Sequence, residues 1–124
     1  LTRILDELGV RHLQDRVTGT LSGSELQKVL IAAALAQDTP VVLLDEPASH
    51  LDPLRAEELV ARLKSLRNKR DRLYVMVSHR SDHFTHVCDR IIALRSGEVM
   101  GTFAPEVAGD PNWQRQVYGN GEEA

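Results

Sequence analysis

The chain has 124 residues, a hydrophobic share of 42% and a formal net charge of -3, values that allow one domain at most. Its single cysteine, Cys88, excludes an intrachain disulfide and favours a reducing compartment, and its longest apolar run, Val29–Ala36, is far too short to cross a bilayer. The chain shows no secretory leader and begins with Leu1 rather than methionine, so we expect a fragment of a cytoplasmic protein.

Two helices are expected in the first third of the chain. The first covers Thr2–Leu8 and ends at Gly9. The second begins after Ser22, because Glu25 follows three residues later and completes a capping box. It runs to about Ala36, and its apolar residues recur at helical spacing: Leu26, Val29, Leu30 and Ala33.

A buried strand is expected over Val41–Leu44, because four branched apolar residues follow one another without alternation. Asp45 and Glu46 then lie at its carboxyl end, and Pro47 stops the strand there. An unpaired carboxylate in a dry site is destabilising by several kcal/mol, so two adjacent carboxylates indicate a bound cation, bound water or both. Magnesium is the expected cation, since it is usually held by one or two carboxylates together with phosphates.

A third helix and a second strand are expected next. Asp52 should cap the helix and Pro53 should occupy its first turn, while Leu73–Val77 forms the strand. A strand, a crossover helix and a strand imply parallel pairing with a right-handed connection. Asp45 and His79 should therefore emerge at the same edge of the sheet, where ligands bind in open α/β sheets. The buried face of the helix is expected to contain Leu59, Leu63 and Leu66.

The last third of the chain is expected to hold a short helix, a hairpin and a final helical turn. Ser81 should cap the short helix, which ends near Cys88. Arg90–Leu94 and Glu98–Phe103 should pair about a Ser-Gly turn. A polar, frayed tail at 122–123 follows the final turn, whose apolar residues are Trp113, Val117 and Tyr118.

Two further patterns have simple structural interpretations. Basic residues crowd between Arg62 and Arg72, where they complement the dipole at a helix end, so we do not expect nucleic-acid binding. His83, His86 and Cys88 suggest metal ligands, but no closed set of four ligands is visible. Solvated or partly buried roles are favoured for these three residues.

Four motifs stand in order along the chain: LSGSE at Leu21–Glu25, VVLLDEP at Val41–Pro47, SHLD at Ser49–Asp52 and VSH at Val77–His79. They resemble the signature, Walker B, D-loop and switch-histidine motifs of the ATP-binding cassette (ABC) ATPases. The resemblance covers nearly the whole chain but only the C-terminal half of a cassette domain. It implies a P-loop NTPase-like α/β fold with a parallel sheet, flanking helices and a closing β-hairpin. It also implies that residues 1–37 end a helical subdomain and that residues 38–124 belong to a RecA-like core.

The resemblance implies hydrolytic roles for three residues. Asp45 would hold Mg²⁺ through water, Glu46 would orient and deprotonate the attacking water, and His79 would steady the γ-phosphate of ATP. Positioning and charge stabilisation supply most of the rate in phosphoryl transfer. The alternative, that Asp45 and Glu46 merely cap a loop, is disfavoured by the flanking motifs.

The resemblance also implies a nucleotide contact across a dimer. A helix start offers unpaired N–H groups and a partial positive charge to a γ-phosphate, here on ATP held by the opposite subunit. Asp52 would contact that subunit. Ser24 replaces the usual second glycine, and Glu25 replaces the usual glutamine, with a charge that could pair with Lys28 or repel phosphate. The residues expected to contact ATP are Leu21, Ser22, Gly23, Ser24 and Glu25.

The Walker A loop is missing from the sequence. No Gly-x-x-x-x-Gly-Lys-Ser/Thr occurs, and none of the lysines follows a glycine. We therefore expect an N-terminal half carrying Walker A as a partner, and no ATP hydrolysis by the chain alone. The other expected partners are a second nucleotide-binding domain and transmembrane permease subunits, which would hold the protein at the inner face of the cell membrane.

The choice of subfamily rests on longer strings. SGSELQKVLIAAALAQDTP, SHLDP and a tail with PEV and VYG most resemble ATPase subunits of bacterial importers for iron-chelate complexes, haem and cobalamin. One alternative is an ABC-type ATPase of DNA repair or chromosome maintenance, disfavoured because no heptad arm flanks the signature helix. Another is a truncated, inert interaction module.

Overall fold

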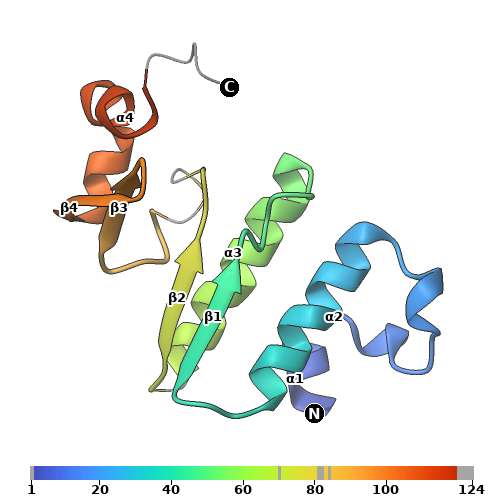
Figure 1. The fold of residues 1–124 in the computed structure, drawn as a ribbon. Helices are drawn as coiled ribbons and strands as arrows, with labels where there is room; N and C mark the ends of the chain where they lie inside the picture. The colour runs from blue at the N-terminus through green and yellow to red at the C-terminus, as the bar shows by residue number, and fades with distance from the viewer. Residues whose placement is uncertain (1, 70, 81–82, 84, 120–124) are drawn as a thin grey trace. The chain divides into compact units, whose positions relative to one another are not determined.

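The computed structural model describes residues 2–69, 71–80, 83 and 85–119. These residues form two compact units, 1–79 and 80–124, which are described here separately (Figure 1). The division between residues 37 and 38 into a helical subdomain and a core stays a prediction. No helix within the described ranges is both long and apolar enough to span a membrane.

The first unit confirms the predicted order of helices and strands. The first helix ends one residue earlier than expected, and Asp45 is the last residue of the strand rather than the first residue after it. Two short 3₁₀ turns, which the sequence analysis did not predict, connect the first two helices. The elements are α1 (Thr2–Glu7), η1 (Arg11–Leu13), η2 (Thr18–Thr20), α2 (Gly23–Ala36), β1 (Val41–Asp45), α3 (Pro53–Lys69) and β2 (Leu73–Val77).

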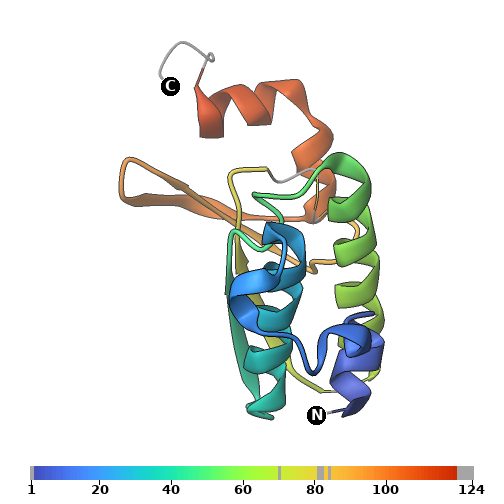
Figure 2. The same ribbon diagram turned by 90° about the vertical axis from the view of Figure 1, so that its right-hand side faces the viewer.

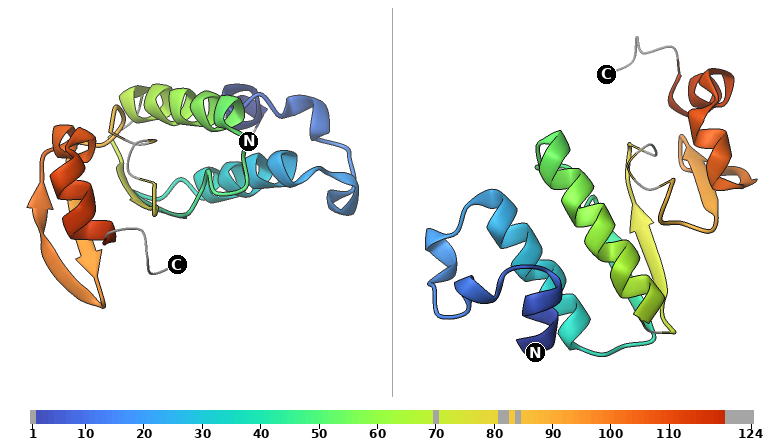
Figure 3. Two further views of the ribbon diagram at one scale, coloured as in Figure 1. Left: turned by 90° about the horizontal axis from the view of Figure 1, so that it is seen from above. Right: turned by 180° about the vertical axis from the view of Figure 1, so that it is seen from behind.

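Strands β1 and β2 are parallel, with Val41 opposite Leu73 and Asp45 opposite Val77. Helix α3 is the crossover between them and lies along one face of the sheet, with α2 beside β1 (Figures 2 and 3). Val42 and Leu44 of β1 are buried on the covered face. The helices contribute these buried residues to the core: Ile31, Ala32, Leu35, Ala56, Leu59, Leu63 and Leu66.

The opposite face of this sheet is apolar and exposed. Leu43 is 72% exposed and Leu73 is 59% exposed, although side chains of this kind are normally buried in a parallel sheet. The prediction that the whole strand Val41–Leu44 is buried is therefore wrong for Val41 and Leu43, because only one face of the sheet is covered. The alternation of burial along β1 and β2 places these residues on the face away from α3. The exposed apolar residues of β1 and β2 are Val41, Leu43, Leu73, Val75 and Val77.

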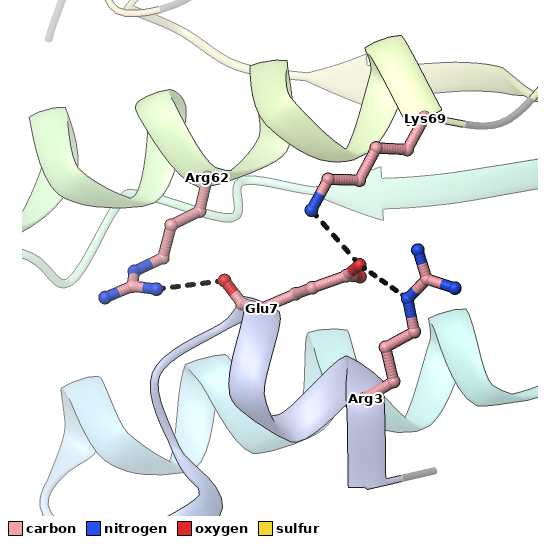
Figure 4. A network of polar contacts seen from close by, with 4 residues as sticks. All are labelled: Arg3, Glu7, Arg62 and Lys69. Carbon is pink, nitrogen blue, oxygen red and sulfur yellow. Dashed lines mark hydrogen bonds and ion pairs between the residues drawn. The ribbon is translucent and has the colours of Figure 1, made fainter.

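A polar network ties α1 to α3 (Figure 4). The Glu7 carboxylate accepts hydrogen bonds from Arg3 Nε at 3.2 Å and Lys69 Nζ at 3.3 Å. Arg62 Nη1 donates to the Glu7 carbonyl oxygen at 2.9 Å. Gly9 permits this approach, because it has φ +67° and a Cβ there would lie 2.5 Å from Arg62 Nη2. Glycine at this position therefore both ends α1 and leaves space for the guanidinium.

The second unit contains the predicted hairpin and a longer final helix than expected. Its elements are β3 (Ile91–Arg95), β4 (Glu98–Phe103), η4 (Pro105–Gly109) and α4 (Pro111–Tyr118). The strands are antiparallel, and Ser96 and Gly97 in the turn have φ +51° and +81°. Positive φ at both positions suits the right-handed twist of a tight hairpin. The predicted helix from Ser81 and the tail at 122–123 lie wholly or partly outside the described residues.

Helix α4 closes a small core over the hairpin. Asp110 caps it by accepting a hydrogen bond from the Asn112 N–H at 2.8 Å. Trp113 is buried against Ala93 and Ala108, and its ring meets that of Phe103 edge-on with centroids 5.6 Å apart. An eight-residue amphipathic helix therefore replaces the single turn that the sequence predicted, because the helix is fixed by a cap and a buried tryptophan.

Candidate functional site

The carboxyl edge of the parallel sheet carries a strained residue. The Glu46 N–H donates to the carbonyl oxygen of Val77 at 2.8 Å, which extends the pairing of β1 with β2 by one residue. Glu46 then turns away with φ +46°, a left-handed conformation that residues with a Cβ rarely adopt. Such conformations persist where the surroundings enforce them and are concentrated at functional sites.

The Glu46 carboxylate is held by His79. Oε1 of Glu46 lies 2.9 Å from the backbone nitrogen of His79 and 2.9 Å from Nδ1 of its ring. An ionised carboxylate only accepts hydrogen bonds, so this contact forms with the His79 tautomer that carries a proton on Nδ1. The parallel arrangement thus brings together two candidate residues 33 positions apart. The backbone N–H of His79 was not singled out from the sequence, although the predicted topology already brought the two strand ends together.

Asp45 lies at the same edge. It pairs with Val77 as the last residue of β1 and its side chain is exposed. It also lines a shallow, mainly apolar groove between α2 and β1, together with Gln27, Leu30 and Leu43. Within the described residues, no group of three or more His, Cys, Asp or Glu side chains is placed to hold a metal ion.

The start of α2 forms the predicted capping box. The Glu25 N–H donates to Ser22 Oγ at 3.2 Å, and the Ser22 N–H donates to Glu25 Oε1 at 3.0 Å. These hydrogen bonds, from the Ser22 backbone first and its side chain second, lower the pKa of Glu25. The nearby charges of Arg16 and His12 act in the same direction. Glu25 is therefore engaged by Ser22 rather than by Lys28.

The other candidate residues of this segment are exposed or only partly buried. Ser24 Oγ lies 3.2 Å from Ser22 Oγ, so one hydroxyl donates to the other. A Cβ added to Gly23 would meet nothing within 4 Å, which shows that the helix start faces open space. Leu21 is partly buried at the end of η2. No hydrogen bond or ion pair in the described part of the chain joins this segment to Glu46 or His79.

Asp52 caps α3 as predicted. Its Oδ1 accepts a hydrogen bond from the Arg55 N–H at 3.0 Å, and its Oδ2 lies 3.4 Å from Arg55 Nη1. Between Glu46 and Asp52 the chain forms tight turns, in which Ser49 donates to the Glu46 carbonyl oxygen from both its N–H and its hydroxyl. These turns fix the strained Glu46 relative to the start of α3.

The sequence of the chain is similar to those of known ABC transporter proteins. Residues 1–49 match the family model described as ABC transporter. The methionine import ATP-binding protein MetN of Bordetella pertussis is 39% identical over 98 residues, which are 79% of this chain and 27% of that protein. The molybdenum import ATP-binding protein ModC of Brucella abortus is 41% identical over 107 residues, which are 83% of this chain and 30% of that protein.

A solved structure shows the same likeness in three dimensions. The cbiO1 protein of Clostridium perfringens, part of the ABC transporter complex cbiONQ, superposes with a TM-score of 0.78 and 28% identity over 93% of this chain. That match covers 46% of the solved chain, so this chain spans about half of the structural neighbour and less than a third of the two curated relatives. The P-loop NTPase-like fold, the relatives and the family match agree, and the chain belongs to the ABC transporter ATPases.

Proposed function

We propose that this chain is part of the ATP-binding and ATP-hydrolysing subunit of an ABC transporter. The observation that carries the proposal is the Glu46 carboxylate held on His79 at the carboxyl edge of a parallel sheet. Both hydrogen bonds that the described residues make to this carboxylate fall on Oε1, so Oε2 would be the oxygen that accepts a hydrogen bond from water. A carboxylate fixed in this way is suited to orient an attacking water and to accept its proton.

His79 has a matching role in the proposal. Its Nδ1 faces Glu46, so Nε2 is the ring nitrogen left for a phosphate oxygen. With a proton on both nitrogens, the ring donates to Glu46 and to the γ-phosphate at once. His79 would then join the base to the group that is transferred, which is the positioning that phosphoryl transfer requires.

ATP and Mg²⁺ are the proposed ligands. Bound Mg²⁺ would neutralise charge on the phosphates. Asp45 has the oxygen donors that Mg²⁺ takes, and a single protein carboxylate is enough where water and phosphate complete the coordination. Asp45 would hold the ion through water at the strand end, beside Glu46.

The start of α2 would serve a second nucleotide. We propose that Leu21–Glu25 contacts the γ-phosphate of ATP bound to a second nucleotide-binding domain, and that Asp52 contacts the same domain. The exposed N-terminus of α2 and the open space around Gly23 support this assignment. Two copies or two halves would then be needed for one hydrolytic site.

The exposed apolar face of β1 and β2 supports a further partner. An N-terminal half carrying Walker A would supply the phosphate loop and cover the apolar face of β1 and β2, which includes Leu43 and Leu73. Residues 1–37 would then close a helical subdomain and residues 38–124 would belong to the core. Permease subunits would hold the assembly at the inner face of the cell membrane.

The proposed transport direction is import. Two relatives are named as import ATP-binding proteins, for methionine and for molybdenum. Within the importers, the strings SGSELQKVLIAAALAQDTP and SHLDP favour the subfamily that takes up iron-chelate complexes, haem or cobalamin. The solute itself is chosen by other subunits in this proposal.

A chimera tests the hydrolytic assignment. A segment that carries the Walker A sequence Gly-x-x-x-x-Gly-Lys-Ser/Thr, taken from an ABC ATP-binding protein, is joined to this chain, and ATP turnover is compared between the chimera and its Glu46→Gln variant. We expect Glu46→Gln to retain ATP binding and to lose turnover by a factor of roughly 100 or more, the scale of a positioned base. Glu57→Gln removes an exposed carboxylate on α3 and is the matched control. Equal turnover in the chimera and in Glu46→Gln would remove Glu46 from the mechanism.

A further inference from the structure

The capping box at the start of α2 contains a negative charge that is not required for its two hydrogen bonds. Capping boxes form with either glutamate or glutamine at the third helical position, because both side chains accept a hydrogen bond from the N-cap N–H. In this chain the acceptor is Oε1 of Glu25, 3.0 Å from the Ser22 backbone nitrogen. A full negative charge therefore lies on the N-terminal end of the helix.

The Glu25 carboxylate binds one of the N–H groups near the helix start and offsets the partial positive charge that would attract an anion. The first N–H groups of a helix have no partner within it, and in α2 they belong to Gly23 and Ser24. Beside them, the Ser22 N–H is already bonded to the Glu25 carboxylate, and the Ser22 hydroxyl accepts from the Glu25 N–H. The partial positive charge of the helix end is thus offset by a carboxylate of the same helix.

The surroundings keep this carboxylate ionised. Its hydrogen bonds with Ser22 lower its pKa, and the charges of Arg16 and His12 lower it further. Near neutral pH, an approaching phosphate therefore meets a negative charge within the same turn of helix. Two like charges a few ångströms apart repel each other even in water, and they repel more strongly where water is excluded.

We propose that the negative charge of Glu25 weakens the binding of phosphate at the start of α2. The inference rests on the proposed function, in which this segment contacts a γ-phosphate. The contact would then be strengthened when the Glu25 side chain moves away from the Ser22 N–H or when a cation binds together with the phosphate. Glutamine at the same position would keep the box closed and remove the repulsion.

The test uses the complete 124-residue chain and inorganic phosphate as the probe. Wild type, Glu25→Gln and the control Glu57→Gln are titrated at constant ionic strength, set with chloride, while backbone amide signals of Gly23 and Ser24 are followed by NMR. We expect Glu25→Gln to bind phosphate about fivefold to tenfold more tightly than wild type, the effect of removing one nearby like charge. Glu57→Gln should bind phosphate as wild type does.

A second variant separates charge from capping. Glu25→Ala removes both the charge and the hydrogen bond to Ser22, and it should also bind phosphate more tightly than wild type. Equal phosphate affinity in wild type, Glu25→Gln and Glu25→Ala would overturn the inference, as would the absence of phosphate-dependent shifts in all of them. Neither outcome involves ATP turnover or Glu46, so failure here is distinct from failure of the proposed hydrolytic function.

Discussion

Two polar regions of the first unit, the start of α2 and the carboxyl edge of the sheet, differ in the sequence distance between their hydrogen-bond partners. At the start of α2, Ser22 and Glu25 satisfy each other within one helical turn, with ordinary backbone angles. At the edge of the sheet, Glu46 adopts φ +46° and reaches His79, 33 residues away, and among the described residues only Oε1 of its carboxylate is hydrogen-bonded. The first arrangement stabilises a helix by itself. The second is a strained arrangement that only the fold maintains, and it is suited to a task beyond stability.

The largest effect is expected on ATP-dependent dimer formation, which should need the start of α2 but not His79. In the chimera with Glu46→Gln, Ser22→Arg should block formation of the ATP-bound dimer, because a long side chain would fill the place of the phosphate. His79→Ala should leave the dimer largely intact in that background, and with Glu46 restored it should slow hydrolysis. Sedimentation with ATP measures the dimer. A normal dimer in Ser22→Arg would mean that the signature segment does not contact nucleotide.

A smaller effect is expected on the free energy of unfolding. Here the change at the start of α2 should matter more than the change at the sheet edge. Ser22→Ala should lower the free energy of unfolding by about 1 kcal/mol, because the cap of α2 is lost. His79→Ala removes an exposed ring whose partner Glu46 remains hydrated, so the change should be within about 0.5 kcal/mol. Urea unfolding of each variant measures both values. A larger loss for His79→Ala than for Ser22→Ala would show that the sheet edge, and not the cap, is the stabilising region.

The smallest expected effect is a pH dependence at the cap. The pKa of Glu25 is lowered in the folded chain, so its contribution to stability is fully present above the unfolded pKa near 4.5 and is lost as the pH falls through the lower, folded value. Wild type should therefore exceed Glu25→Gln in stability at pH 7, and the difference should shrink below about pH 4.5. Urea midpoints at several pH values check this. A difference that stays constant down to pH 2 would rule out the carboxylate charge as its source.

Local patterns in the sequence predicted most of the first unit. The capping box at Ser22, the cap at Asp52 and the strand at Val41–Leu44 each depend on a few neighbouring residues, and each is present. The shared edge of Glu46 and His79 followed from the handedness of the crossover. Their direct contact and the positive φ of Glu46 could not be predicted, because they depend on side-chain packing of segments 33 residues apart.

Other features could not be predicted from sequence patterns, because they also depend on packing between segments far apart in the chain. The approach of Arg62 to Gly9 joins two helices more than fifty residues apart, and no local signal marks it. The length of α4 was underestimated, because its stability comes from burial of Trp113 against the hairpin rather than from its own composition. The functional roles of Asp45, Glu46 and His79 stay predictions, since geometry shows the arrangement and only chemistry tests its use.

The most direct test of the account is ATP hydrolysis with and without a phosphate loop. Steady-state phosphate release is measured for the pure 124-residue chain, for its Glu46→Gln variant, and for the chimera that adds a segment with the Walker A sequence. The account predicts no release by the chain above its Glu46→Gln control, because nothing in its sequence cradles the β- and γ-phosphates, and Glu46-dependent release by the chimera. Release by the chain alone that Glu46→Gln abolishes would contradict it, as would a folded, ATP-binding chimera without turnover.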